Sequence, residues 1–289
     1  MHRTAALIAA LALAVSGCGG ASSKPADPTT PADHAQTGAQ RDLLAKALAA
    51  FKRAPTGTYE SEVTADGVSQ PTAHETGSYR LRPAASAYER AILGIDEASG
   101  KPRVQVVRVR STAGGTWFLQ LKEWGSWTGC WLRTDLPEIT KLTGVTSARG
   151  SSLPTAVTIL AKATVVGSGD GMDGPHLAVD AYSALQFLGV AGSAIAGERA
   201  ALSKVLVPVL LDVTANGGPS GAAVEGTQVF TALEAARAPL TSKLKAFVSK
   251  THARVVFSDL GKAVSITAPS RAELLPQNPA STSTCAVNR

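Results

Sequence analysis

The 289-residue chain has few cysteines, few aromatic residues and few charged residues, and each shortage excludes a class of protein. Three cysteines are too few for a disulfide-stapled miniprotein or a four-cysteine zinc site. Aromatic residues, at 5%, are too sparse for stacking platforms that bind bases or sugars. Charged residues are 17%, and the formal charge of +6 comes without a basic run, which argues against a nucleic-acid binder. After the first twenty residues, no apolar run reaches the roughly 18 residues that a membrane-spanning helix needs.

The N-terminus combines a basic start, an apolar stretch and a cysteine. Met1-His2-Arg3 precedes Ala5–Val15, which is too short to span a membrane and has the length of a signal-peptide core. The following Val15-Ser16-Gly17-Cys18 resembles a bacterial lipobox, whose small residues let the chain lie extended in the peptidase cleft. The resemblance implies a diacylglycerol anchor on Cys18, at the outer face of the cytoplasmic membrane. The alternative is an ordinary secretory signal with an incidental cysteine.

The chain divides into four parts by composition. Residues 1–17 are the predicted signal peptide. Residues 18–39 carry the lipidated cysteine and a stretch rich in Gly, Ser, Thr, Pro and Ala, which cannot bury an apolar face and is predicted to be a disordered tether. Residues 40–276 are predicted to form one domain, and residues 277–289 a polar tail.

Apolar periodicity predicts a helix followed by a sheet. Arg41–Arg53 places Leu44, Ala47, Leu48 and Phe51 on one face and ends before Pro55. The period then becomes two, which indicates an antiparallel meander with one apolar and one polar face. Gly114-Gly115 marks a tight turn within it. The predicted strands are Thr58–Thr64, Ser78–Arg82, Val104–Arg110 and Thr116–Lys122.

The second half is predicted to add one helix and further strands. Pro154 suits the first turn of a helix over Leu153–Ala163. Ala191–Leu206 is interpreted as helical, and Lys243–Lys250 fits a helix or a strand equally well. The predicted strands are Leu177–Leu185, Val205–Thr214, Ala222–Thr231, Arg254–Ser258 and Val264–Thr267.

Two strand ends in the second half resemble a known family. Pro208–Asp212 followed by Asn216–Pro219, and Val256–Gly261 followed by Ile266–Pro269, resemble the strand ends of LolA-like lipoproteins, especially the LppX/LprAFG-type group. The likeness covers roughly residues 40–276. It implies an α+β fold, in which a strongly curved antiparallel sheet forms an unclosed half-barrel with helices packed on its concave face. It also implies an apolar cavity that accepts acyl chains.

Strand alternation selects the side chains expected to line that cavity. Because each buried methylene contributes about 0.8 kcal/mol, acyl chains need no specific polar contact. Plain core packing is the alternative for Trp117, whereas Trp124 and Trp127 flank a Gly-Ser turn and are expected to be exposed. The residues expected to point inward are Tyr79, Leu81, Trp117, Leu119, Leu121, Val209 and Leu211.

No motif for catalysis, cofactor binding or metal binding occurs in the sequence context that it requires. Gly169–Gly174 matches G-x-G-x-x-G, but Pro175 and a strand follow where a helix is required, so we predict a turn. No G-x-S-x-G nucleophile elbow occurs. Four histidines are each isolated, with no second metal ligand nearby in the sequence. We therefore predict no enzyme, catalytic residue, metal or cofactor; the isolated histidines are His34, His74, His176 and His252.

Cys130 and Cys285 remain after lipidation. Outside the cytoplasmic membrane, a remaining pair of cysteines bridges more often than it stays free, so we predict a disulfide. The bond would pin the polar tail to the tryptophan-rich strand. Two unpaired thiols are the alternative.

Three classes of function remain. A binder of a lipid or lipoconjugate, for carriage or presentation in the envelope, fits the family likeness and the absence of chemical motifs. A partner-binding or sensory lipoprotein with the same fold, acting on an envelope protein, is the alternative, and an enzyme fits least. The expected partners are a membrane, through Cys18, and a lipid ligand, with no nucleic acid.

Overall fold

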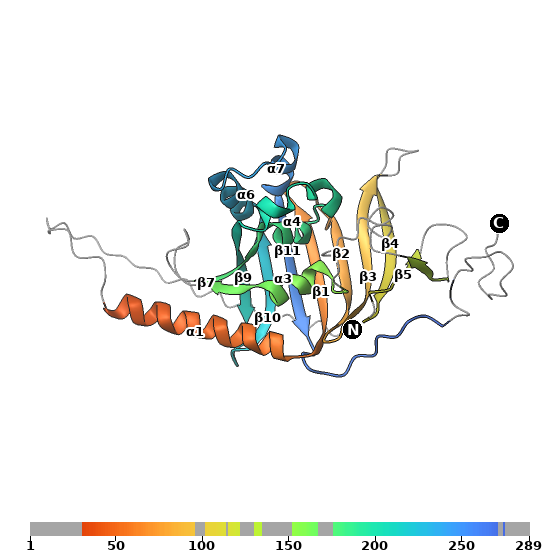
Figure 1. Cartoon of the computed structure of the whole chain (residues 1–289), viewed down its shortest axis with the longest axis horizontal. Coiled ribbons are helices and arrows are strands. Elements are labelled where there is room, and N and C mark those ends of the chain that lie inside the picture. The colour runs from red at the N-terminus through yellow and green to blue at the C-terminus, as the bar shows by residue number, and fades with distance from the viewer. Residues whose placement is uncertain are drawn as a thin grey trace, which may run out of the picture.

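One open antiparallel sheet organises the protein. The computed structural model describes residues 31–95, 102–113, 115–121, 130–134, 152–166, 176–270 and 274. The strand order is β6-β5-β4-β3-β2-β1-β11-β10-β9-β8-β7, and the edge strands β6 and β7 each have one neighbour. Helices cover one face of the sheet, with α3 and α4 in front of the strands in Figure 1. The predicted fold class, an unclosed antiparallel sheet with helices packed on it, is confirmed.

The strands fall into two consecutive runs that β11 joins. The first run is a meander of β1 (Thr56–Ala65), β2 (Ala73–Leu81), β3 (Ala84–Ile95), β4 (Pro102–Ser111), β5 (Trp117–Leu121) and β6 (Leu132–Thr134). The second run contains β7 (Thr164–Val166), β8 (His176–Asp180), β9 (Leu206–Val213), β10 (Pro219–Glu225) and β11 (Thr251–Ser258). Because β11 pairs with both β10 and β1, the last strand of the chain joins the two runs into one sheet.

Seven helical segments accompany the strands in the described part of the chain. They are α1 (Pro31–Arg53), α3 (Thr155–Lys162), α4 (Ala181–Phe187), the 3₁₀ segment η2 (Gly192–Ile195), α5 (Arg199–Leu202), α6 (Gly226–Ala235) and α7 (Ser242–Val248). None of the described helices is both long and apolar enough to cross a membrane.

The two faces of the sheet differ in what they carry. On β1, Tyr59 and Val63 are buried while Glu60 and Glu62 are exposed, as the twofold alternation of a strand requires. The face with Tyr59 is called the inner face, and the face with Glu60 the outer face. Inner-face side chains form one hydrophobic core with the helices, which contribute Leu160 and Leu185 among others.

The predicted first helix is confirmed and is longer than expected. Its buried residues include Ala47 and Phe51, and the Phe51 ring lies 4.9 Å from that of Phe257 on β11. The helix begins at Pro31, so the prediction of a disordered tether is wrong for residues 31–39. Pro31 suits the first position of a helix, and the alanines after it have high helix propensity, which sustains the helix beyond its packed end.

The alternation-based strands in the first half are confirmed as β1, β2, β4 and β5, but the longest strand, β3, was not predicted. Its sequence contains four alanines, which are depleted in strands. Polar Ser86 and Arg90 also occupy its buried positions and so hide the alternation. Gly115 has φ 72°, as the predicted turn before β5 requires.

Two predicted strands instead end early in helices. Leu177–Leu185 is strand only to Asp180, whose side chain accepts a hydrogen bond from Ser183 N at 2.8 Å and caps α4. Ala222–Thr231 is strand only to Glu225, and Gly226 then begins α6 in contact with the Val248 carbonyl. Both predictions failed because a short apolar run has the same appearance in a buried helix and a buried strand.

Some of the remaining predictions are confirmed and others are wrong. Val205–Thr214 and Arg254–Ser258 are confirmed as β9 and β11, and Leu153–Ala163 as α3. The undecided Lys243–Lys250 contains helix α7, while Ala191–Leu206 holds only the short η2 and α5. The strand predicted at Val264–Thr267 is wrong, because that segment pairs with no strand. The Gly169–Gly174 turn lies outside the described residues.

Candidate functional site

The predicted cavity residues gather on the inner face. Four are almost fully buried in the core, with exposed fractions of 0–3%: Tyr79, Trp117, Leu119 and Val209. Leu81 and Leu211 are partly buried and pack against the same core. The side chain of Leu121 lies outside the described residues, as do Trp124 and Trp127. For Trp117, membership of the core agrees with plain packing; a cavity against these residues stays a prediction.

A buried ion pair that the sequence did not predict also lies on the inner face. Arg90 on β3 and Glu75 on β2 are direct partners in the β2–β3 register. Arg90 Nη1 donates to Glu75 Oε2 at 3.2 Å, and Tyr59 Oη donates to Glu75 Oε1. Both charged residues are at most 7% exposed. Burial, reinforced by the Glu75 charge, holds the pKa of Tyr59 well above its usual range, so its hydroxyl remains a donor.

Within the described part of the chain, three buried polar atoms on this face have no hydrogen-bond partner. They are Arg90 Nε, Tyr88 Oη and Tyr79 Oη. Burial raises the pKa of Tyr88 and of Tyr79, which keeps both hydroxyls protonated. An unsatisfied buried polar group costs about 1–3 kcal/mol, and folded proteins rarely leave one. Tyr88 and Arg90 are two residues apart on the same strand and therefore project from the same face.

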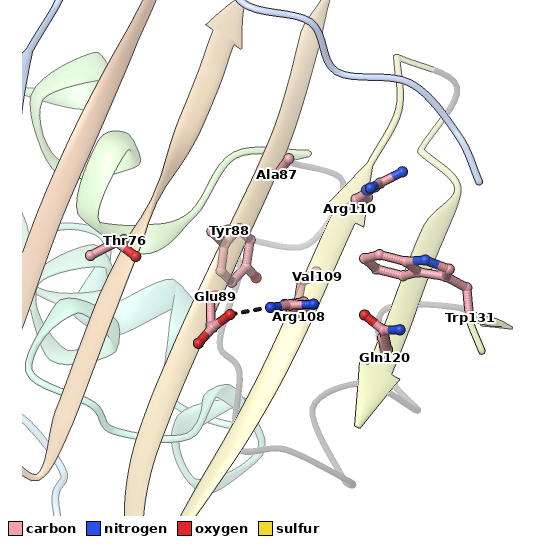
Figure 2. A pocket seen from close by; sticks show the side chains of 9 residues that line it. All are labelled: Thr76, Ala87, Tyr88, Glu89, Arg108, Val109, Arg110, Gln120 and Trp131. Atoms are coloured by element: carbon pink, nitrogen blue, oxygen red, sulfur yellow. Dashed lines mark hydrogen bonds and ion pairs between the residues drawn. The ribbon is translucent and has the colours of Figure 1, made fainter. Parts of the chain in front are cut away.

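A pocket of about 460 Å³ opens on the opposite side of the sheet, over β2–β5 and beside Trp131 (Figure 2). It is called the outer-face pocket. Ala87, Tyr88 and Val109 form part of its lining. None of the predicted cavity residues lines it. Its polar and aromatic lining consists of Thr76, Glu89, Arg108, Arg110, Gln120 and Trp131.

The two arginines of the outer-face pocket are held differently. Arg108 Nε donates to Glu89 at 2.9 Å across the β3–β4 pair. The Arg110 guanidinium lies over the Trp131 ring at 4.5 Å and donates to the Thr267 carbonyl at 3.5 Å. The sequence analysis missed this pocket because it predicted neither β3 nor β6. The clustering of tryptophans was the only signal that pointed to this region.

The chain after β11 returns to the pocket side of the molecule. Figure 1 shows it in blue, running past the ends of the strands toward β5. Thr56 Oγ1 donates to the Lys262 carbonyl at 2.7 Å, and Leu274 forms a parallel bridge with Trp131. Cys130, the residue before Trp131, is buried and disulfide-bonded. Its partner lies outside the described residues, so the pairing with Cys285 stays a prediction.

Two histidines that are isolated in sequence have acidic neighbours in space. His74 Nε2 lies 2.8 Å from Glu60 Oε1, and Glu62 offers a further oxygen within 4.8 Å of these atoms. His252 lies between Glu225 and Asp66. These neighbours are distant along the sequence, and the expectation that the protein holds no metal stays a prediction. Cross-strand pairing brings the carboxylates together, which sequence spacing does not reveal. His34 has a side chain outside the described part.

Hydrogen bonding to Glu225 is the main reason that the pKa of His252 rises above its ordinary value. Burial opposes this rise, and Asp66 adds to it through a hydrogen bond at 3.2 Å. A protonated His252 thus connects the turn after β1 with the end of β10. The arrangement is that of an exposed ion-pair network rather than a reactive site.

No protein-family model matches the chain, and no curated protein matches it. Among solved structures, it is similar to the lipoprotein LppX of Mycobacterium tuberculosis, with 12% identity, 80% of this chain and 99% of that chain covered, and a TM-score of 0.37. It is also similar to LprF from Mycobacterium bovis, with 13% identity, coverage of 81% and 98%, and a TM-score of 0.41. Both belong to the group that the strand-end motifs resemble.

Proposed function

We propose that this protein is a membrane-anchored envelope lipoprotein that binds the acyl chains of a lipid or lipoconjugate between its sheet and its helices, for carriage or presentation. The observation that carries the proposal is the set of unpartnered donors on the inner face, with Arg90 Nε and Tyr88 Oη on one strand. Oxygen atoms of a bound amphiphile would supply their missing acceptors. Its acyl chains would lie against the apolar core around them.

The charge balance of the cluster favours one kind of acceptor. Glu75 already neutralises Arg90 through the 3.2 Å hydrogen bond. A free carboxylate would bring a second negative charge into a buried site, which is costly. An ester carbonyl or a hydroxyl satisfies the same donors without adding charge. We infer that the ligand is an esterified lipid rather than a free fatty acid.

The anchor belongs to the same proposal. It rests on Val15-Ser16-Gly17-Cys18, which resembles a lipobox. A Cys18→Ala chain is expected to leave the membrane fraction or to remain uncleaved in detergent partitioning. Retention equal to that of the wild type would contradict the anchor and leave the cavity proposal standing.

The cavity is tested with Leu119→Trp, on the inner face of β5. If an acyl chain lies against Leu119, the larger side chain fills space that the ligand needs, so bound lipid falls while the melting temperature of the protein changes little. Overpacking a filled core instead costs about 1–3 kcal/mol. The measurement pairs the melting temperature with the lipid extracted from protein purified from its native host.

Val106→Trp is the matched control. Val106 is half-buried on the neighbouring strand β4 and projects from the outer face, so the same side chain is added away from the proposed cavity. We expect this variant to keep its lipid. A large fall in melting temperature for Leu119→Trp, with no lipid in the wild type, would contradict lipid binding.

A further inference from the structure

We propose that the outer-face pocket binds a phosphate group, carried by a free phosphate ester or by a lipid headgroup. Nothing in the inner-face proposal requires this site. Its polar side chains on β2–β5 project from the outer face, although Tyr88 on β3 borders the pocket as well. The proposal stands on the charge of the pocket, the orientation of its arginines and its size.

The pocket has an excess of positive charge. Its lining contains two arginines and one carboxylate, and Glu89 is already paired with Arg108. The Arg110 guanidinium interacts with the Trp131 ring and the Thr267 carbonyl, and neither group is anionic. Arg133 is exposed and is separated from Arg110 only by Phe118 on β5, so it adds a further positive charge on the same face.

The arginines are fixed in a geometry that suits an oxyanion. Arg108 and Arg110 are two residues apart on β4, so both project from the outer face at a spacing of about 7 Å. The Trp131 ring orients the Arg110 guanidinium, which lowers the entropy that binding would otherwise cost. Guanidinium groups bind phosphate through paired charge-assisted hydrogen bonds.

The neutral hydrogen-bonding groups and the size of the pocket restrict the class of ligand that fits. Gln120 and Thr76 offer an amide and a hydroxyl on opposite sides of the arginines, as Figure 2 shows. These groups suit the hydroxyls of a polyol attached to the phosphate. The volume of about 460 Å³ lies within the range of small-molecule sites, which is about 300–1,000 Å³. A glycerol phosphate unit has these chemical features.

The test is isothermal titration calorimetry of the full chain in a neutral detergent. Glycerol phosphate represents a free phosphate ester, short-chain phosphatidylglycerol represents a lipid headgroup, and glycerol is the neutral control. We expect at least one phosphate probe to bind while glycerol does not. Arg110→Gln is expected to weaken this binding by about tenfold or more, since it removes a charged hydrogen-bond donor.

Arg80→Gln is the matched control, because Arg80 lies on β2 outside the pocket lining and donates to the Pro83 carbonyl. It is expected to leave binding unchanged. Gln120→Leu is a second pocket variant, for which we expect a smaller loss. Melting temperatures of all variants check that they are folded.

The two phosphate probes separate the sources of the ligand. Arg110-dependent binding of glycerol phosphate supports a free phosphate ester, and Arg110-dependent binding of phosphatidylglycerol alone supports a lipid headgroup. The proposal is overturned if neither probe binds at millimolar concentration. Binding that Arg110→Gln leaves unchanged would also overturn it, without affecting the inner-face proposal.

Discussion

The inner and outer faces of the sheet place charged side chains in opposite surroundings. On the outer face, Arg254 pairs with Asp212 at 2.9 Å, and both side chains are about half exposed or more. On the inner face, Arg90 and Glu75 are paired but almost fully buried, and Arg90 Nε has no partner among the described residues. Exposed ion pairs contribute about 0–1 kcal/mol, whereas breaking a buried pair costs about 3–5 kcal/mol. The face on which an ion pair lies therefore determines how much stability is lost when the pair is broken.

The largest effect is expected from Glu75→Leu. The variant leaves the Arg90 charge buried without a counterion, so the free energy of unfolding should fall by about 3–5 kcal/mol in urea titration. Adding Arg90→Met should recover most of the loss, because a buried ion pair replaced by apolar residues of similar size is often neutral in stability. If Glu75→Leu alone lowers the free energy of unfolding by only about 0–1 kcal/mol, the range of an exposed ion pair, then Arg90 is solvated and the comparison fails.

Arg254→Ala is the outer-face counterpart. Since Arg254 and Asp212 are both solvated, the expected loss in the free energy of unfolding is at most about 1 kcal/mol in the same titration. The comparison between the faces fails if this variant is destabilised as strongly as Glu75→Leu.

The smallest effect is expected at His252 and depends on pH. Glu225 and Asp66 raise the pKa of His252 in the folded protein. The stabilisation is therefore fully present below the unfolded-state pKa of about 6.5 and is lost as the pH rises through the higher folded-state value. The melting temperatures of the wild type and His252→Gln should differ most in acid and converge in alkali. A difference that grows with rising pH would contradict this assignment.

Alternation and periodicity predicted the elements whose sequences keep one apolar face. Leu119 and Val209 could be assigned to the inner face in this way, and both are buried there. β3 could not be predicted, because Arg90 occupies an inward position where an apolar residue was expected. The Arg90–Glu75 pair depends on the β2–β3 register, which no periodicity encodes. The outer-face pocket was missed for the same reason, since Arg108 meets Glu89 only through strand pairing.

The helices that begin within predicted strands show a different limit of prediction from the sequence. Asp180 caps α4 through a hydrogen bond to Ser183 N, so a local signal for the helix was present in the sequence. Gly226 marks the start of α6, but its close approach to the Val248 carbonyl is a tertiary contact. Apolar content alone does not separate a strand from the helix that follows it.

The central claim is that an amphiphile lies between the sheet and the helices, with its oxygen atoms against Arg90 and Tyr88. Mass spectrometry of the full chain from its native host, under non-denaturing and then denaturing conditions, tests it most directly. A covalent anchor on Cys18 stays in both spectra, whereas a bound lipid is lost on denaturation. We predict an additional mass in the non-denaturing spectrum that corresponds to an esterified lipid. Identical masses under the two conditions would contradict the account.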